Sequence, residues 1–289
     1  MIPAAFQYHA PANLREALAI LRRYPGEAKV LAGGHSLLPM MKLRLAQPAH
    51  LVDLGRIRDL AHIRERDGGL AIGPMTSYHM LESSSLVQQR VPVLSEAASV
   101  VADLQVRNKG TIGGSLAHAD PAADLPAPVV ALEAQIHTAG GGRARRIPAD
   151  RFFVDVFTTG LRETEVITEI FIPPLPSRTG SSYQKFANKA SHFAIVGVAA
   201  VVTLDNQGNC ERVRIGITGA SSKAVRARAA ERYLTGKEPS EGNIEQAAEY
   251  STLGIECLND LHASGEYREH LTRVFTAKAL AQAVQQASR

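Results

Sequence analysis

Apolar residues recur at helical spacing near the start of this 289-residue chain, which predicts its first element. One apolar stripe is formed by Leu14, Ala17, Leu18 and Leu21. Asn13 precedes this stripe and Glu16 stands at the third helical position, a pattern typical of a helix N-cap. We therefore expect a helix over about 13–24.

Shorter apolar runs divide the rest of the first two-thirds of the chain into two predicted units. The first unit, residues 1–56, has strands at 30–31 and 51–54 on either side of a glycine turn, giving a compact β-α-β arrangement. The second unit, residues 57–176, alternates short strands with helices; we expect strands at 70–73, 135–138 and 165–172 and a helix at 93–102. Prolines at 173–177 break any regular element and predict a linker.

The third unit, residues 177–289, begins with strands and ends in helices. The expected strands cover 183–187, 193–205 and 211–218, and the expected helices cover about 222–235, 242–258 and 266–287. Gly236 follows the first of these helices as a stop signal. The order of strands and helices over the whole chain predicts the α+β class.

Composition and charge narrow the function classes. The chain is 45% hydrophobic and 21% charged, an ordinary globular profile that suffices for two or three small domains. Its net charge is +4, but the one tight basic cluster lacks interleaved aromatic residues, so we favour a solvated face over nucleic-acid binding; the cluster is Arg143, Arg145 and Arg146. The longest apolar run, 193–204, is too short to span a bilayer, and no signal-peptide pattern begins the chain, so we expect a cytoplasmic protein without membrane insertion.

The two cysteines, Cys210 and Cys257, stand far apart and form no C-x-x-C motif. By themselves they cannot hold an iron-sulfur cluster or a structural zinc ion. We expect no metal site here. If this chain transfers electrons, the clusters that supply them belong to another chain.

The candidate chemistry lies in two diglycine turns about eighty positions apart. They are Ala32-Gly33-Gly34-His35-Ser36 and Thr111-Ile112-Gly113-Gly114-Ser115. Adjacent glycines let backbone N–H groups approach phosphate oxygens, and a neighbouring serine adds a donor. Neither turn fits the Rossmann or the P-loop motif, and each alone is also typical of an ordinary tight turn. Together they predict a diphosphate between two loops, and so a dinucleotide cofactor.

The segments 31–44, 105–114 and 165–173 resemble the FAD-binding medium subunit of molybdenum hydroxylases, the group of the aerobic carbon monoxide dehydrogenases and xanthine dehydrogenases. The resemblance covers nearly the whole chain. It implies a two-part FAD-binding domain of the PCMH (vanillyl-alcohol oxidase-like) type, followed by a smaller C-terminal α+β domain of the carbon monoxide dehydrogenase flavoprotein type with a three-stranded sheet. The chain departs from the pattern at Ser115, where close relatives have an acidic residue or asparagine, and at Leu125, where they have histidine.

The resemblance implies a non-covalent FAD and a set of residues that bind it. The two loops contribute Leu31, Ala32, Gly33, Gly34, His35, Ser36, Leu37 and Leu38, and Thr111, Ile112, Gly113, Gly114 and Ser115. Asp124 matches an acidic contact to the cofactor's polyol, and Val101 and Ile167 match apolar contacts. Lys185 matches a lysine near the flavin ring, and Phe193 matches an aromatic residue that covers one ring face. No catalytic residue is implied.

Plainer interpretations of several residues stay open. His35 is as compatible with an ordinary turn as with a phosphate contact. Asp120 and Asp124, with a proline between them, are more typical of a helix cap and a hydroxyl ligand than of an acid-base pair. Lys185 is also compatible with a solvated strand position, and by periodicity alone Phe193 is a core residue.

The implied function is electron transfer by an oxidoreductase subunit. A molybdenum-cofactor large subunit oxidises the substrate, an iron-sulfur small subunit passes the electrons on, and FAD in this chain delivers them to an external acceptor. The implied assembly is a dimer of heterotrimers, a heterohexamer. Two alternatives remain: a self-sufficient FAD-dependent NAD(P)H oxidoreductase, which no second dinucleotide motif supports, and a scaffold that keeps the fold without the cofactor. The substrate and the acceptor are not fixed by this chain.

Overall fold

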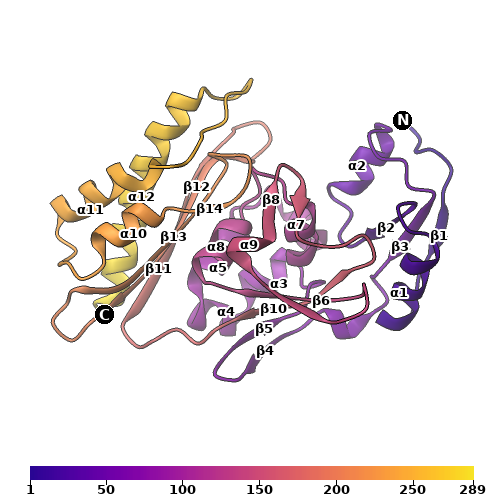
Figure 1. The fold of residues 1–289 in the computed structure, drawn as a ribbon, viewed down its shortest axis with the longest axis horizontal. Helices are drawn as coiled ribbons and strands as arrows, with labels where there is room; N and C mark the ends of the chain where they lie inside the picture. Colours follow the sequence, from indigo (N-terminus) through magenta and orange to yellow (C-terminus); the bar gives the residue numbers. More distant parts are fainter.

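The N-terminal unit of the computed structural model, which describes residues 1–289, is a parallel sheet of order β1-β3-β2 (Figure 1). Its elements are β1 (Gln7–His9), α1 (Leu14–Arg23), β2 (Ala28–Leu31), α2 (Leu37–Lys42) and β3 (His50–Asp53), followed by a 3-10 turn, η1 (Arg58–Leu60). The Asn13 side chain accepts a hydrogen bond from the Glu16 N–H, which confirms the predicted start of α1. β1, a three-residue strand that pairs with β3, was not predicted from the sequence.

The second unit is built on an antiparallel sheet of order β4-β5-β10-β6-β7. Its strands are β4 (Ile63–Arg66), β5 (Gly69–Ile72), β6 (Gln135–Ala139), β7 (Arg145–Pro148) and β10 (Val166–Ile172), with a separate hairpin of β8 (Phe153–Asp155) and β9 (Thr158–Thr159). Its helices are α3 (Tyr78–Ser83), α4 (Ser85–Arg90), α5 (Pro92–Ser99), α6 (Leu104–Lys109), α7 (Ile112–His118), α8 (Pro126–Ala131) and α9 (Ala149–Phe152). The helix expected over 93–102 ends at Ser99, because Ala102 turns the chain with φ 42° and the Asp103 side chain caps the next helix.

The C-terminal unit is an antiparallel sheet of order β11-β12-β13-β14 covered by helices. Its elements are β11 (Thr179–Ala187), β12 (Ala194–Leu204), β13 (Cys210–Thr218), β14 (Val225–Arg226), α10 (Arg228–Leu234), α11 (Glu241–Glu249), a 3-10 turn η2 (Tyr250–Thr252) and α12 (Gly265–Ala287). The three expected strands are present. The helix expected from 222 begins only at Arg228, because Val225 and Arg226 pair with β13 as a short fourth strand. None of the helices combines the length and apolar character needed to cross a bilayer.

The central strand β12 is buried on both faces, which explains the long apolar run in its sequence. Ala199 and Val201 pack into the core of the second unit. Val198, Ala200 and their neighbours on the other face pack into a separate core beneath α10 and α12. The C-terminal sheet therefore shares a core with the second unit, and this shared core fixes the position of the loops at its edge.

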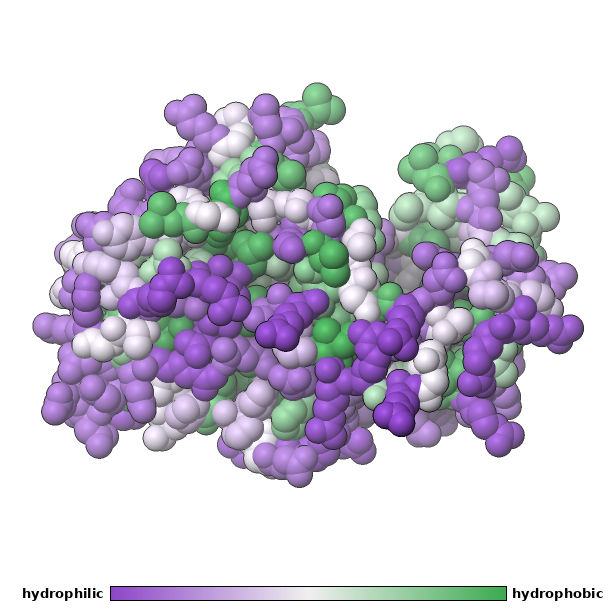
Figure 2. All heavy atoms as spheres, in the orientation of Figure 1, coloured by the Kyte–Doolittle hydropathy of each residue, from purple (hydrophilic) through white to green (hydrophobic).

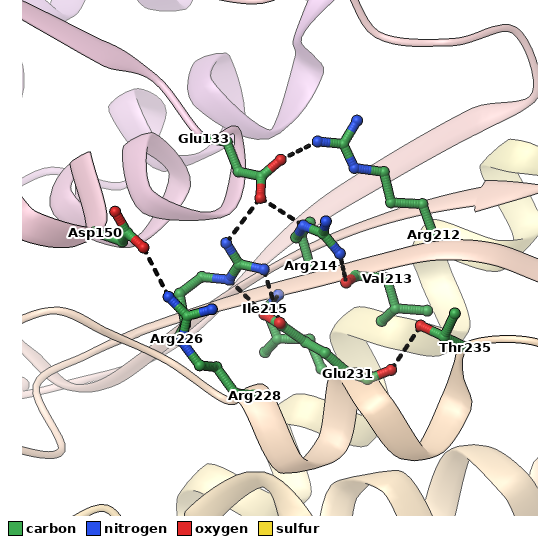
Figure 3. Close-up of polar contacts among 10 residues, drawn as sticks. All are labelled: Glu133, Asp150, Arg212, Val213, Arg214, Ile215, Arg226, Arg228, Glu231 and Thr235. Carbon is green, nitrogen blue, oxygen red and sulfur yellow. Dashed lines mark hydrogen bonds and ion pairs between the residues drawn. The ribbon is translucent and has the colours of Figure 1, made fainter. Parts of the chain in front are cut away.

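A cluster of ion pairs joins the same two units (Figure 3). Glu133, just after α8, contacts three arginines from β13 and β14: Arg212, Arg214 at 2.7 Å and Arg226 at 3.2 Å. Arg226 is buried and also donates to Glu231 at the start of α10, with Nη2 2.7 Å from Oε2. One carboxylate of the second unit therefore balances several cations of the C-terminal unit.

We expect Glu133→Gln to lower the free energy of unfolding by about 2 kcal/mol, because it removes the shared charge while Arg226 stays buried. The effect is smaller than the roughly 3–5 kcal/mol of a fully buried pair, since Glu133 is partly exposed. The matched control is Asp150→Asn, which breaks a more exposed pair with Arg228 and is expected to cost no more than about 1 kcal/mol. Urea unfolding measures both, and equal losses would contradict a special role of Glu133.

Candidate cofactor site

The two diglycine turns meet in the structure. The first turn connects β2 to α2, and the second forms the N-cap and first turn of α7; both lie on the sides of their units that face each other (Figure 1). A Cβ placed on Gly33 would lie 2.1 Å from the carbonyl oxygen of Lys109, and one on Gly114 would lie 3.5 Å from the Ala32 Cβ. The approach at Gly33 is possible only for glycine. The space-filling view shows the surface hollowed between the N-terminal unit and the rest of the molecule (Figure 2).

The first turn presents free hydrogen-bond donors. None of the five backbone N–H groups from Ala32 to Ser36 donates to a backbone carbonyl. Gly34 has φ +79°, in the left-handed region, so neighbouring N–H groups can converge on one point. Backbone N–H groups need hydrogen-bond acceptors, so these five groups can bind water or a ligand. A diphosphate fits this donor set in charge and in hydrogen-bonding capacity.

The second turn differs from the expectation, because four of its five N–H groups, those from Ile112 to Ser115, already donate hydrogen bonds within the protein. Those of Ile112 and Gly113 donate to the carbonyls of Thr76 (3.0 Å) and Pro74 (2.9 Å), and that of Gly114 donates to the Thr111 Oγ1 (3.1 Å). A Cβ on Gly113 would lie 2.3 Å from the Pro74 side chain. The second turn is therefore a closely packed wall opposite the first turn, and only the first turn offers a run of free donors.

A buried polar cluster lies between the second unit and β11. Asp124, 5% exposed in the loop between α7 and α8, accepts from the Tyr183 hydroxyl (2.7 Å) and from Lys185 Nζ (2.8 Å). Lys185 Nζ also donates to the Val100 carbonyl (2.9 Å). Tyr183 and Lys185 are two positions apart on β11, so their side chains share one face of the sheet. Only 6% of the Lys185 side chain is exposed, so it is not a solvated strand lysine.

Burial governs protonation in this cluster. It raises the pKa of Asp124 to about 6, although the charge of Lys185 and the hydrogen bonds from Lys185 and Tyr183 lower it. Burial, together with the nearby Asp124, raises the pKa of Tyr183 well above its usual value, so the phenol stays a hydrogen-bond donor. At neutral pH the cluster therefore contains an ionised Asp124 paired with Lys185 and held by Tyr183.

This pKa predicts a pH dependence of stability with a definite sign. The native pKa of about 6 exceeds the ordinary value of 3.8, so the native state binds the proton more tightly than the unfolded state does. The contribution of Asp124 to stability should therefore increase as the pH falls through 6, by roughly 2 kcal/mol between pH 7.5 and pH 4.5. The measurement is the difference in unfolding free energy between the wild type and Asp124→Asn from pH 7.5 to 4.5; a flat difference would exclude the raised pKa.

Residues 4–175 match the family described as the FAD binding domain in molybdopterin dehydrogenase. The chain belongs to this family. Residues 181–283 match the carbon monoxide dehydrogenase flavoprotein C-terminal domain. These matches confirm the predicted family and the α+β fold of an FAD-binding part followed by a smaller C-terminal domain.

Individual relatives align with the chain almost from end to end. The carbon monoxide dehydrogenase medium chain of Hydrogenophaga pseudoflava is 41% identical over 280 residues, 97% of each chain. The 6-hydroxypseudooxynicotine dehydrogenase complex subunit alpha of Paenarthrobacter nicotinovorans is 38% identical over 287 residues, 99% of this chain and 97% of that one. A solved structure of the Hydrogenophaga pseudoflava carbon monoxide dehydrogenase, lacking the Mo-pyranopterin moiety, superposes with a TM-score of 0.95 and 43% identity over 99% of both chains.

The remaining residues expected to contact FAD lie in different environments. Phe193 is 48% exposed just before β12, so the core assignment from periodicity was wrong; the Ala194 N–H bonds to the Ala122 carbonyl, which places Phe193 near the Asp124 loop. Val101 is half-buried after α5, whereas Ile167 is buried within β10. Around the first turn, the side chains of Leu31 and Leu38 pack against Gly34. His35 and Ser36 are exposed, and Leu37 is half-buried at the start of α2.

Tyr183 and the pairing of Asp124 with Lys185 were not predicted from the sequence. The aspartate and the lysine were expected to be two independent contacts to the cofactor. They are 61 positions apart, and no local pattern links them. The available signal was the spacing of Tyr183 and Lys185 on one predicted strand, which places a buried hydroxyl and a cation on the same face.

Proposed function

We propose that this chain is the FAD-carrying medium subunit of a heteromeric molybdenum hydroxylase. It takes electrons from an iron-sulfur small subunit that serves a molybdenum-cofactor large subunit, and passes them to an external acceptor. The observation that carries this proposal is the run of free N–H groups from Ala32 to Ser36 facing the packed turn at Gly113 and Gly114. When bound, FAD supplies a group able to exchange one or two electrons.

The residues act by binding, orienting and excluding water. In this proposal the N–H groups of the first turn hold the diphosphate, and α7 closes the site from the opposite side. Asp124 accepts a hydrogen bond from a hydroxyl of the polyol, and Phe193 covers one face of the flavin. Lys185 lies near the ring, but its charge is largely balanced by Asp124, so the pair rather than the lysine alone sets the local potential. Val101 and Ile167 are the apolar contacts.

The relatives support this function over the alternatives. Both named relatives are chains of dehydrogenases, one a medium chain and the other a subunit of a complex. They support a subunit role rather than a self-sufficient NAD(P)H oxidoreductase. Their names point to different substrates, carbon monoxide and 6-hydroxypseudooxynicotine, as expected if another subunit binds the substrate. The free donors of the first turn favour a cofactor-binding chain over a cofactor-free scaffold.

The proposed domain organisation keeps the boundaries predicted from the sequence. The two parts of the FAD-binding domain are residues 1–56 and 57–176, and the C-terminal domain is 177–289. The proposed assembly is a cytoplasmic dimer of heterotrimers formed with the iron-sulfur and molybdenum subunits.

The test is gentle purification of the tagged chain from its native host, with FAD, iron and molybdenum measured in the product. We expect one FAD per chain, together with an iron-sulfur chain and a large molybdenum chain in equal amounts. Recovery of the chain alone, with FAD that NADH or NADPH bleaches, would support the self-sufficient oxidoreductase instead. A folded, pure chain that takes up no FAD would support the scaffold.

A further inference from the structure

We propose that Arg268, in α12 of the C-terminal domain, is a positioning residue for the loop that presents Asp124 to the cofactor. The loop, residues 119–125, connects α7 to α8 and is called the Asp124 loop below. Arg268 acts on it through the ends of β12 and β13. The inference rests on the proposed FAD function and gives the C-terminal domain a part in shaping the FAD site.

The Asp124 loop depends on the C-terminal sheet for its shape. Within the loop, Asp120 accepts two hydrogen bonds, from the N–H groups of Ala122 and Ala123. The three consecutive carbonyls of the loop, from Pro121 to Ala123, instead accept hydrogen bonds from the C-terminal domain. The donors are Gly219 N–H to Pro121 (2.7 Å) and Ala194 N–H to Ala122 (3.2 Å), while Thr218 Oγ1 lies 2.8 Å from the Pro121 oxygen and 2.7 Å from the Ala123 oxygen.

Arg268 ties together the two strand ends that supply these donors. Its Nη1 donates to the carbonyls of Ile195 (2.6 Å) and Gly219 (2.7 Å), and its Nη2 pairs with Asp260 at 2.7 Å. Ile195 is the extra residue of a bulge in the pairing of β11 with β12. Gly219 has φ +78°, and a Cβ there would lie 2.5 Å from the Ile195 carbonyl oxygen. The ends of β12 and β13 therefore touch, and the arginine holds both.

Arg268 is buried, so its loss would affect the strand ends that it contacts. Arg268 is 4% exposed, and the hydrogen bonds to these carbonyls and to Asp260 offset the cost of burying its charge. Without the guanidinium, the carbonyls of Ile195 and Gly219 lose this donor. Both carbonyls lie where the ends of β12 and β13 hydrogen-bond to the Asp124 loop. The loop carries Asp124, and the Ala194–Ala122 bond ties it to the residue next to Phe193. A change at Arg268 is thus transmitted to two predicted cofactor contacts that it does not touch.

The test compares Arg268→Met with Arg273→Met in the full-length FAD-loaded chain. Arg273 is on the same helix and pairs with Glu249 and Glu269, so its loss removes ion pairs without reaching the Asp124 loop. The readouts are the FAD dissociation constant and the visible circular dichroism of the bound flavin, at a temperature where both variants are folded. We expect Arg268→Met to weaken FAD binding at least about tenfold and to change the dichroism, Arg268→Lys to restore part of both, and Arg273→Met to change neither.

A second variant covers the case in which Arg268→Met fails to fold. Thr218→Val keeps the size of the side chain and Arg268 itself, but removes the hydroxyl that contacts Pro121 and Ala123. We expect the same change in dichroism and weaker FAD binding. If either folded variant loses only thermal stability, with wild-type FAD affinity and dichroism, the positioning role is excluded. Failure of the wild-type chain to bind FAD would instead overturn the proposed function, so the two failures are distinguishable.

Discussion

Gly33→Ala is expected to abolish retention of FAD while leaving the protein folded. The new Cβ would lie 2.1 Å from the Lys109 carbonyl oxygen and 2.8 Å from the Gly110 Cα. Both are backbone atoms, so no side-chain rotation relieves the contact, and the first turn must move away from the second unit. We expect FAD affinity to fall at least about 100-fold, or roughly 3 kcal/mol. The measurement is the ratio of FAD to protein after gel filtration.

The matched control is Gly242→Ala. Gly242 lies in α11, and nothing is within 4 Å of a Cβ placed there. Gly242→Ala should keep both its FAD and its far-ultraviolet circular dichroism. Gly33→Ala should keep the dichroism but lose the FAD. Full FAD content in Gly33→Ala would show that the two turns need not approach each other to hold the cofactor.

Lys185→Met is expected to have the second large effect, on stability and on the flavin together. It leaves Asp124 buried without its cation, which costs roughly 3–5 kcal/mol in comparable buried pairs. Adding Asp124→Asn should recover most of this loss, because no uncompensated charge then remains. Urea unfolding at pH 7.5 of the two single variants and the double variant gives the coupling between the two residues.

The flavin potential separates a charge effect from a packing effect. Loss of Lys185 raises the pKa of Asp124 further above 6, so the potentials are compared at alkaline pH, where Asp124 is ionised. There the native pair is neutral overall, Lys185→Met leaves a net negative charge, and the double variant is neutral again. A negative charge near the ring opposes its reduction, so the midpoint potential should fall in Lys185→Met and return toward the wild-type value in the double variant. Equal potentials in the single and double variants would show that the pair lies too far from the flavin to influence it.

Elements with strong local patterns could be predicted from the sequence. The apolar stripe and the Asn13 cap located α1, and the apolar run of β12 identified a buried strand. The strands β1 and β14 were missed because two or three residues carry little periodicity, and they become strands only by pairing with β3 and β13. The early end of α5 depends on Asp103, whose side chain starts a new helix.

The site could be predicted in part, for a similar reason. Glycine pairs mark both turns in the sequence. Which turn keeps its donors free depends on Pro74 and Thr76, which occupy the N–H groups of the second turn from about forty positions away. The partnership of Asp124 with Lys185 likewise exists only once the C-terminal sheet packs on the second unit. The residue types of the site could be recognised in the sequence, whereas which residues pair with each other depends on the fold.

The central claim is that the first turn binds the cofactor diphosphate through its backbone, and a crystal structure of the FAD-loaded chain tests it most directly. We predict diphosphate oxygens within hydrogen-bonding distance, about 2.7–3.2 Å, of N–H groups between Ala32 and Ser36, with α7 on the opposite side. A structure in which the diphosphate lies elsewhere, and these N–H groups bind only water, would contradict the account.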